Sequence, residues 1–365
     1  MADRTGIEWT DATWNPIVGC SLASPGCTNC YAMPMAARIE AMQPGSHYAG
    51  TTQPGNAGAV WSGKVALAPE HILTQPLRWR RPRRIFVNSM GDLFHESIPD
   101  EWIDHVFAIM ALCPQHTFQV LTKRSARMRE YLTGPAAFQR VDELLFAEEW
   151  PVLPKPFDTI AAAANMTPFA REGFLRNVWL GVSTEDQRRA DERVPDLLAT
   201  PAAIRFVSAE PLLGALNLRS LNERRGDRGT ITDWHDALAG LQFGRSQSET
   251  AKLDLVIAGG ENGPRPMHPD WARSLRDQCA AADVLFFFKQ WGTWEVAVDR
   301  ERDDPDWRLD YSRKFADGGA TKWLNLAGGC GFHGARFHVM RRVAKARAGR
   351  LLDGVEHNAL PEVRS

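Results

Sequence analysis

The sequence predicts an α/β fold, namely a complete or partial TIM-like (β/α) barrel with parallel strands. Short apolar runs, typical of buried strands, alternate with segments of helical periodicity, and almost every run ends in a polar or ionisable residue. Continuously apolar strands that alternate with helices indicate a parallel sheet covered on both faces. The carboxyl ends of such strands meet at one face, where barrel enzymes place their active sites.

The predicted elements follow one another along the chain. A first strand before Gly19 leads into a loop and then into a helix over 32–41, with Pro34 in the first turn, where proline is tolerated. Further strands are predicted over 84–88, 117–121, 177–182, 203–207, 253–258 and 284–288, and further helices over 99–112, from 125, over 186–199 and over 269–281.

The length of the chain exceeds what one barrel needs. A full barrel takes roughly 250 residues, and the chain has 365. We therefore predict a barrel domain over 1–294, with a mostly helical insertion at 133–176 and a polar insertion at 219–252, followed by a C-terminal extension over 295–365 that packs on the barrel. A doubly wound open sheet would instead show a glycine-rich phosphate turn after an early strand. The sequence has no such turn.

Composition restricts the partners of the protein. The formal net charge is -1, so the whole molecule has no electrostatic attraction to nucleic acid, and any such binding must be local. One local candidate is a cluster of arginines with Trp79 just before the strand at 84–88, and another is a predicted basic helix over 341–350. For both, a solvated charged face is the alternative. No apolar run is long enough to cross a bilayer, so we expect a cytoplasmic protein with no membrane partner.

A loop with three closely spaced cysteines is the strongest chemical signal. Cys20, Cys27 and Cys30 are separated by six and then two residues, in a segment whose Gly, Ser, Pro and Asn indicate a loop. Thiolates this close in sequence can converge on zinc, copper(I) or an iron-sulfur cluster. A closed structural zinc site needs a fourth ligand, and the nearest histidine is His47. Three thiolates suit a 4Fe-4S cluster with one open iron.

A second cysteine and histidine segment lies near the C-terminus. It is the glycine-rich stretch 328–334, which contains Cys330 and His333 and is followed by His338. Both a metal site and a mobile loop with incidental Cys and His fit this composition.

Several strings outside the cysteine loop carry a family resemblance. They are Ile7-Glu8-Trp9-Thr10-Asp11, Thr13-Trp14-Asn15-Pro16, Asn88-Ser89-Met90-Gly91-Asp92-Leu93-Phe94, Ser208-Ala209-Glu210-Pro211-Leu212 and Gly259-Gly260-Glu261. With the cysteine loop they resemble the phage-associated three-cysteine-motif family of unknown function, over nearly the whole chain. The cysteines also resemble those of the radical S-adenosylmethionine superfamily, whose usual spacing is three and then two residues.

The resemblance implies a set of cofactors and partners. It implies a 4Fe-4S cluster on Cys20, Cys27 and Cys30, S-adenosylmethionine at the open iron, an external electron donor, and a 5′-deoxyadenosyl radical that abstracts a substrate hydrogen. Members of the family are often encoded beside a partner protein, so a partner subunit is expected as well.

The resemblance also implies roles for residues at the strand ends. Gly91 and Asp92 would bind the methionine ammonium group, Lys123 its carboxylate, and Ser183 or Glu185 the ribose. Glu210 with Gly260 and Glu261 would flank the adenine and the methionine carboxylate, while Tyr31 is the aromatic residue beside the last cysteine. The sequence identifies no catalytic acid or base.

Two functional hypotheses remain open at this point. The first is a radical enzyme that modifies or repairs nucleic acid or a nucleotide, a substrate class suggested by the phage setting and the local basic clusters. The second is a non-catalytic, phage-related module whose cysteines hold zinc or a structural cluster and which binds nucleic acid or a partner protein. A zinc-dependent hydrolase lacks the His and carboxylate spacing that such sites need.

Overall fold

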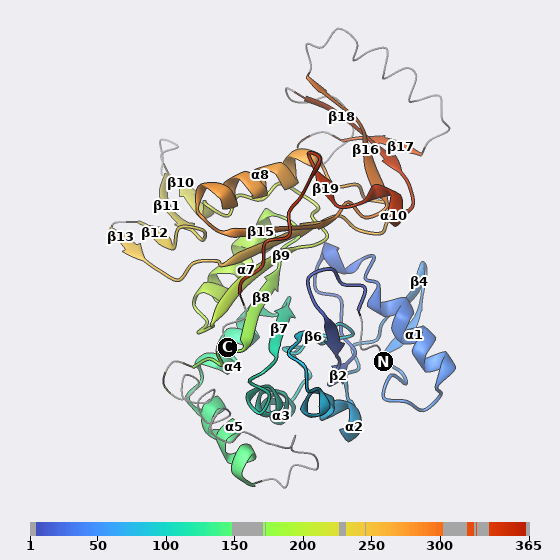
Figure 1. Cartoon of the computed structure of the whole chain (residues 1–365), viewed down its shortest axis with the longest axis vertical. Coiled ribbons are helices and arrows are strands. Elements are labelled where there is room, and N and C mark those ends of the chain that lie inside the picture. The colour runs from blue at the N-terminus through green and yellow to red at the C-terminus, as the bar shows by residue number, and fades with distance from the viewer. Residues whose placement is uncertain are drawn as a thin grey trace. The chain divides into compact units, whose positions relative to one another are not determined.

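The computed structural model describes most of the chain in two compact units, which are treated one at a time below (Figure 1). The first unit comprises 1–182, 193–206 and 361–365, and the second comprises 183–192 and 207–360. The predicted division after residue 294 stays a prediction. The described residues are 5–147, 171, 173–225, 231–244, 246–301, 320–324, 326 and 336–362.

The α/β class and the parallel sheet of a partial barrel are confirmed. Seven strands form a sheet that curls into a half-barrel, in the order β1-β6-β7-β8-β9-β14-β15, and the pairs β1–β6, β6–β7, β7–β8 and β14–β15 are parallel. These strands are β1 (Ala12–Trp14), β6 (Arg84–Val87), β7 (Thr117–Thr122), β8 (Val178–Ser183), β9 (Ile204–Ala209), β14 (Leu255–Gly259) and β15 (Leu285–Gln290). Each predicted strand lies within two residues of an observed one at both ends.

Burial explains why apolar runs predict these strands so well. All six residues of β8 and all five of β14 are buried, as expected for strands with protein on both faces. The helices between the strands are α1 (Ala32–Met42), α2 (Glu70–Leu73), α3 (Asp100–Ala111), α4 (Ser125–Thr133), α5 (Pro135–Ala147), α7 (Gln187–Leu198) and α8 (Pro269–Ala281), with single-turn 3-10 helices η1 (Pro25–Cys27) and η2 (Gln75–Arg78). None of the described helices is long and apolar enough to cross a membrane.

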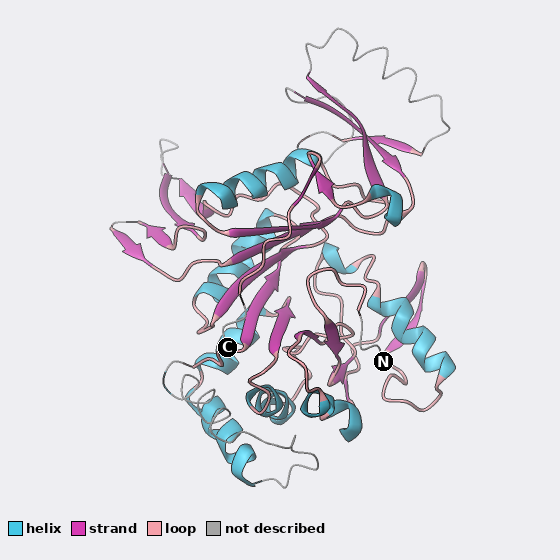
Figure 2. Cartoon of the chain, viewed as in Figure 1, coloured by secondary structure: helices cyan, strands magenta, loops and turns pink. Residues whose placement is uncertain are grey.

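The polar insertion at 219–252 folds as a small antiparallel sheet (Figure 2). Its strands are β10 (Leu221–Arg225), β11 (Ile231–Asp236), β12 (Leu241–Phe243) and β13 (Gln247–Glu249). Trp234 and Phe243 face each other across β11 and β12 with ring centroids 4.2 Å apart, a stacked pair that stabilises the pairing. Of the helical insertion predicted at 133–176, the structure describes α5 and residues 171 and 173–176.

The C-terminal extension is mainly β structure. It contains β16 (Trp294–Glu301), β17 (Thr321–Trp323), β18 (Arg336–Arg342), α10 (Lys345–Ala348), β19 (Leu351–Leu352) and β20 (Val355–Glu356). The basic helix predicted over 341–350 is confirmed only at Lys345–Ala348, which is α10, and is wrong for Arg341 and Arg342, which belong to β18. Arg341 pairs across the sheet with Glu295, which neutralises it. Two further antiparallel pairs lie in the first part of the chain: β2 (Ile17–Val18) with β5 (Ala66–Leu67), and the hairpin of β3 (Thr52–Gly55) with β4 (Gly58–Trp61).

Candidate functional site

The cysteine loop begins at the carboxyl end of β6, as the sequence predicts for a site. Gly19 forms a parallel bridge with Gly91, and its N–H donates to the Met90 carbonyl at 3.0 Å. Gly19 has a φ of 92°, and a Cβ there would lie 2.1 Å from the Lys64 carbonyl oxygen. A Cβ on Gly91 would lie 3.0 Å from the Gly19 carbonyl oxygen. Both glycines are therefore needed for the backbones to approach so closely.

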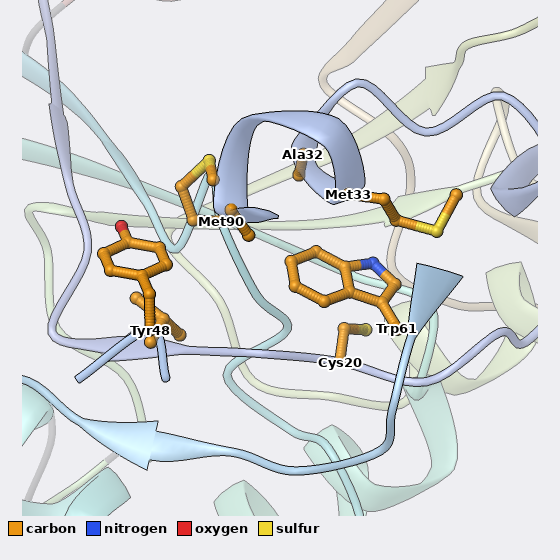
Figure 3. Packing of buried hydrophobic residues seen from close by; sticks show 8 residues of the cluster. Cys20, Ala32, Met33, Tyr48, Trp61 and Met90 are labelled. Atoms are coloured by element: carbon orange, nitrogen blue, oxygen red, sulfur yellow. The ribbon is translucent and has the colours of Figure 1, made fainter. Parts of the chain in front are cut away.

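The three cysteines differ in their surroundings. Cys20 is buried in an apolar cluster with Trp61, Met33 and Met90 (Figure 3). Cys27, also buried, ends η1, and its sulfur accepts a hydrogen bond from a backbone N–H four residues earlier at 3.5 Å. Cys30 is half-buried and packs against the cluster that holds Cys20. Cys20 and Cys30 therefore belong to one apolar cluster.

The number of thiols bears on the kind of metal centre. The Cys27 thiol lies near enough to Cys20 to raise its pKa, and Cys30 packs against the apolar cluster that holds Cys20. A closed zinc site needs four ligands. In a 4Fe-4S cluster each thiolate binds a different iron, so three thiols can hold a cluster with one open iron.

Asp92 is tied to the protein itself. Its Oδ1 accepts hydrogen bonds from the Thr122 hydroxyl at 2.6 Å and the Phe94 N–H at 3.2 Å. Its Oδ2 accepts from the Lys123 N–H at 2.9 Å and from the Arg124 guanidinium at 3.2 Å. The carboxylate is buried and joins the ends of β6 and β7. Its expected role toward a methionine ammonium group stays a prediction, and the observed contacts are structural.

Arg124 occupies the centre of this network, although the sequence pointed to its neighbour Lys123. The guanidinium is 7 % exposed, and its Nη1 donates both to Asp92 and to the Cys20 sulfur, the latter at 3.5 Å. Its Nη2 donates to the Ser21 carbonyl at 3.0 Å and to the Ser21 hydroxyl at 2.8 Å, and its Nε contacts Glu96 at 3.4 Å. One side chain therefore holds the loop on both sides of the Cys20–Ser21 peptide.

The electrostatics of Cys20 follow from this arrangement. Burial and then Asp92 raise the pKa of the Cys20 thiol and Arg124 opposes both, so that the pKa is raised to about 12. Without a metal the thiol is protonated at neutral pH. Metal binding must therefore release that proton, which makes loading dependent on pH.

A histidine and a serine complete the polar surroundings. His95 Nε2 lies 2.9 Å from the Ser21 hydroxyl, and its Nδ1 accepts the Ser97 N–H at 3.1 Å. With Nδ1 as an acceptor, the neutral ring carries its proton on Nε2 and donates to Ser21. Burial and then Arg124 lower the pKa of His95, which favours that neutral form. The ring therefore orients Ser21 and does not activate it as a nucleophile.

Tyr31 and Lys123 are placed at the same edge. Tyr31 is 56 % exposed, and its hydroxyl donates to the Ser89 carbonyl at 3.0 Å, which links the start of α1 to the loop after β6. Lys123 is half-buried, and its backbone N–H, as described above, binds Asp92.

The remaining strand-end candidates lie in the second unit. Ser183 ends β8 and is buried, and Glu185 is 1 % exposed with its carboxylate 4.0 Å from Arg189. The Glu185 carbonyl accepts the Leu213 N–H at 2.7 Å. Through this backbone hydrogen bond Glu185 holds the segment that follows β9.

Glu210 and Lys289 are brought together by β9 and β15. The Lys289 ammonium lies 3.3 Å from Glu210 Oε1, and both side chains are less than 20 % exposed. A Cβ on Gly259 would lie 2.6 Å from the same Oε1, so the glycine makes room for the carboxylate. Ser208 donates to Glu210 Oε2 at 3.4 Å. This acid and base pair therefore lies where β9 and β15 end, largely covered by the protein.

Gly260 and Glu261 have mainly structural contacts. A Cβ on Gly260 would lie 2.3 Å from the Trp291 carbonyl oxygen, so only glycine fits there. The Glu261 carboxylate forms a forked pair with Arg265, with Oε1 3.0 Å from Nε and Oε2 2.6 Å from Nη2. Their expected roles toward a cofactor stay predictions.

A further cluster of ligand-type residues lies at the start of α8. One ligand atom from each of His268, Asp270 and His338 lies within 4.8 Å of the others. His338 is fully buried, with Nε2 3.2 Å from Asp270 and Nδ1 3.1 Å from Asp299. Both of its ring nitrogens therefore face carboxylates, as in a buried imidazolium. The glycine-rich stretch 328–334 lies outside the described residues.

The arginine cluster before the strand at 84–88 is placed away from the cysteine loop. It precedes β6, whereas the loop meets the carboxyl end of that strand, and four residues of strand span about 13 Å. Trp79 is 8 % exposed and lies under the Arg83 guanidinium, 5.0 Å from it. The indole is covered by the protein and has little surface left for stacking on a base.

The fold and the site define an α/β protein with a partial barrel of parallel strands and a three-cysteine loop at the carboxyl end of β6. The sequence as a whole also matches one protein family. The chain belongs to the family described as "Protein of unknown function (DUF5131)", which matches residues 4–361. Comparisons with curated proteins and with solved structures gave no match.

Proposed function

We propose that this protein binds a 4Fe-4S cluster through Cys20, Cys27 and Cys30 and is a radical S-adenosylmethionine-type enzyme. One observation carries the proposal: a single loop, fastened beside the end of β6, holds three thiols, of which Cys20 and Cys30 share one apolar cluster and Cys27 lies near enough to Cys20 to raise its pKa. Three protein ligands leave one iron of such a cluster for an exogenous ligand.

The cofactors would supply the chemistry and the chain would supply position. When bound and reduced by an external donor, the cluster provides the electron that cleaves S-adenosylmethionine to a 5′-deoxyadenosyl radical. The chain holds the loop through Gly19, Gly91 and Arg124, and the apolar cluster around Cys20 excludes water from that sulfur. Glu210 and Lys289 are the best-placed polar pair of the second unit for contacts to a polar ligand.

The proposal is tested by the metal content of cysteine variants. Wild-type protein reconstituted anaerobically with iron and sulfide should bind about four irons and four sulfides and absorb visible light. Cys20→Ala, Cys27→Ala and Cys30→Ala should each lose most of that absorbance. Cys279→Ala is the matched control, because Cys279 is a free buried cysteine of α8 and not part of the loop, so its replacement should leave the cluster intact.

Turnover is a separate measurement. With dithionite as reductant, the loaded wild-type protein should form 5′-deoxyadenosine from S-adenosylmethionine. Zinc in place of iron in the wild-type protein would refute the cluster, and a stable cluster without 5′-deoxyadenosine would refute the radical chemistry.

The proposed substrate class is nucleic acid or a nucleotide. Its support is the pair of exposed arginines, Arg80 and Arg81, before the amino-terminal end of β6. Binding of single-stranded and duplex DNA and RNA should then weaken with salt. Arg80→Gln with Arg81→Gln should reduce the salt dependence, and an unchanged salt dependence would exclude this surface.

A second candidate is a non-catalytic cluster or metal module that binds a partner protein. The observation in its favour is a group of exposed large apolar residues in and after the cysteine loop: Leu22, Tyr31, Met35 and Met42. Exposed apolar side chains that gather at one place often contact a partner. A loaded cluster with no turnover, together with tighter partner binding by the loaded form, would select this candidate.

A further inference from the structure

Arg124 makes contacts that go beyond holding a loop. Its guanidinium donates a hydrogen bond to the Cys20 sulfur at 3.5 Å, and it also donates to the carbonyl and the hydroxyl of Ser21. The side chain is buried, so water does not screen these contacts. Asp92, at 3.2 Å from Arg124, is the balancing negative charge.

We infer that Arg124 is a positioning residue of the cysteine site that sets the reduction potential of the cluster bound there, with Asp92 acting in the opposite direction. This inference rests on the proposed function. Hydrogen bonds to the sulfurs and nearby charge are the main means by which a protein tunes a cluster. A cation that donates to a thiolate stabilises the form with the extra electron, whereas a buried anion disfavours it.

Arg124 and Asp92 should shift the reduction potential of the cluster in opposite directions, because their charges are opposite and both lie beside Cys20. Removing Arg124 takes away an N–H···S contact and leaves the Asp92 charge unbalanced, so one-electron reduction of the cluster becomes harder. Removing the charge of Asp92 leaves the guanidinium unopposed beside Cys20, so reduction becomes easier. Removing both should return the potential toward that of the wild type. A merely structural role for the pair would not produce shifts of opposite sign.

The experiment is a redox titration of the loaded proteins, with dithionite as the reductant and electron paramagnetic resonance as the readout. Arg124→Met should lower the midpoint potential by at least about 59 mV, a tenfold change in the one-electron equilibrium constant. Asp92→Asn should raise it, and the double variant should lie between the two. Arg127→Met is the matched control, because Arg127 lies one turn further along and pairs with Asp100.

A second measurement covers the case in which Arg124→Met loads poorly. In the metal-free protein, Arg124→Met should speed backbone amide hydrogen exchange over residues 20–23 at least threefold, because the loop loses its anchor, and Arg127→Met should not. Arg124→Lys keeps the charge and loses the planar fork, so it should fall between wild type and Arg124→Met.

The outcomes separate this inference from the proposed function. A wild-type protein that binds no iron or sulfide overturns the proposed function and this inference with it. A wild-type protein that loads normally, with Arg124→Met and Asp92→Asn at the wild-type potential or shifted in the same direction, overturns this inference alone. An unchanged rate of amide hydrogen exchange over residues 20–23 in metal-free Arg124→Met also contradicts the anchoring role.

Discussion

Replacing His338 by glutamine tests the buried ion network that joins β16 and β18 to α8. Burial alone would lower the pKa of His338, but its contacts with Asp270 and Asp299 outweigh this and raise the pKa above its ordinary value. Burial likewise acts to raise the pKa of both aspartates, yet hydrogen bonds from His338 and Arg273 hold them well below the usual range. The other charged or titratable groups that face the cluster are His268, Arg336 and Asp353.

The size of the effect can be reasoned from the contacts that remain. Breaking a buried ion pair by removing one partner costs about 3 to 5 kcal/mol. In His338→Gln, Arg273 still contacts both carboxylates and Arg336 still contacts Asp299, so we expect the lower end, about 3 kcal/mol. Urea unfolding at pH 6 measures the loss. His105→Gln is the control, because His105 is exposed at least in part and should change stability by less than about 0.5 kcal/mol.

The pH dependence has a definite sign. Because the folded-state pKa of His338 is raised, its contribution is fully present below the unfolded value of 6.5 and is lost as pH rises through the folded value. The aspartates have depressed pKa values, so their contribution is present above 3.8 and is lost as pH falls. The difference between wild type and His338→Gln should therefore be largest between about pH 4 and 6.5 and shrink toward pH 9.

Two results would refute this reasoning. One is equal stability of the wild type and His338→Gln at pH 6. The other is a wild-type stability that increases with micromolar Zn²⁺ and does so no longer in His338→Gln, since that would make His268, Asp270 and His338 a metal site.

The remaining predictions concern the core and the thiols. Gly181→Ala should cost about 1 to 3 kcal/mol in urea unfolding, because its Cβ would lie 2.4 Å from the Phe206 ring, and a neutral result would contradict that packing. Tyr48→Phe should be neutral or stabilising by about 1 kcal/mol, because the buried hydroxyl has no hydrogen-bond partner among the described residues. In the metal-free protein, iodoacetamide should modify half-buried Cys30 before buried Cys20, and mass spectrometry would show the reverse order if the loop were arranged otherwise.

The positions of the strands could be predicted because a strand that is buried on both faces needs apolar residues at nearly every position. The run Val178–Ser183 is buried throughout, so a central parallel strand must be apolar without alternation, and the pattern is visible in the sequence. The cysteine loop was predictable for a different reason, because its three cysteines lie close together in a segment rich in Gly, Ser, Pro and Asn.

The strands of the insertion at 219–252 could not be predicted from the sequence. Its strands are short, and β13 is exposed throughout, so no periodic burial distinguishes them from a polar loop. The Trp234–Phe243 pair that holds β11 to β12 depends on a register that only the folded chain specifies.

By itself, therefore, the sequence determined the α/β class, the strands of the half-barrel and the loop that carries the three thiols. The tertiary structure alone decided that Arg124, and not Lys123, reaches the Cys20 sulfur, and that Asp92 is already bound by four donors. The physical reason is that a charged side chain can be buried only where other groups pair with it and bind it by hydrogen bonds. Those partners come from segments about 30 and 100 residues away, and no local pattern records which neighbour turns inward to meet them.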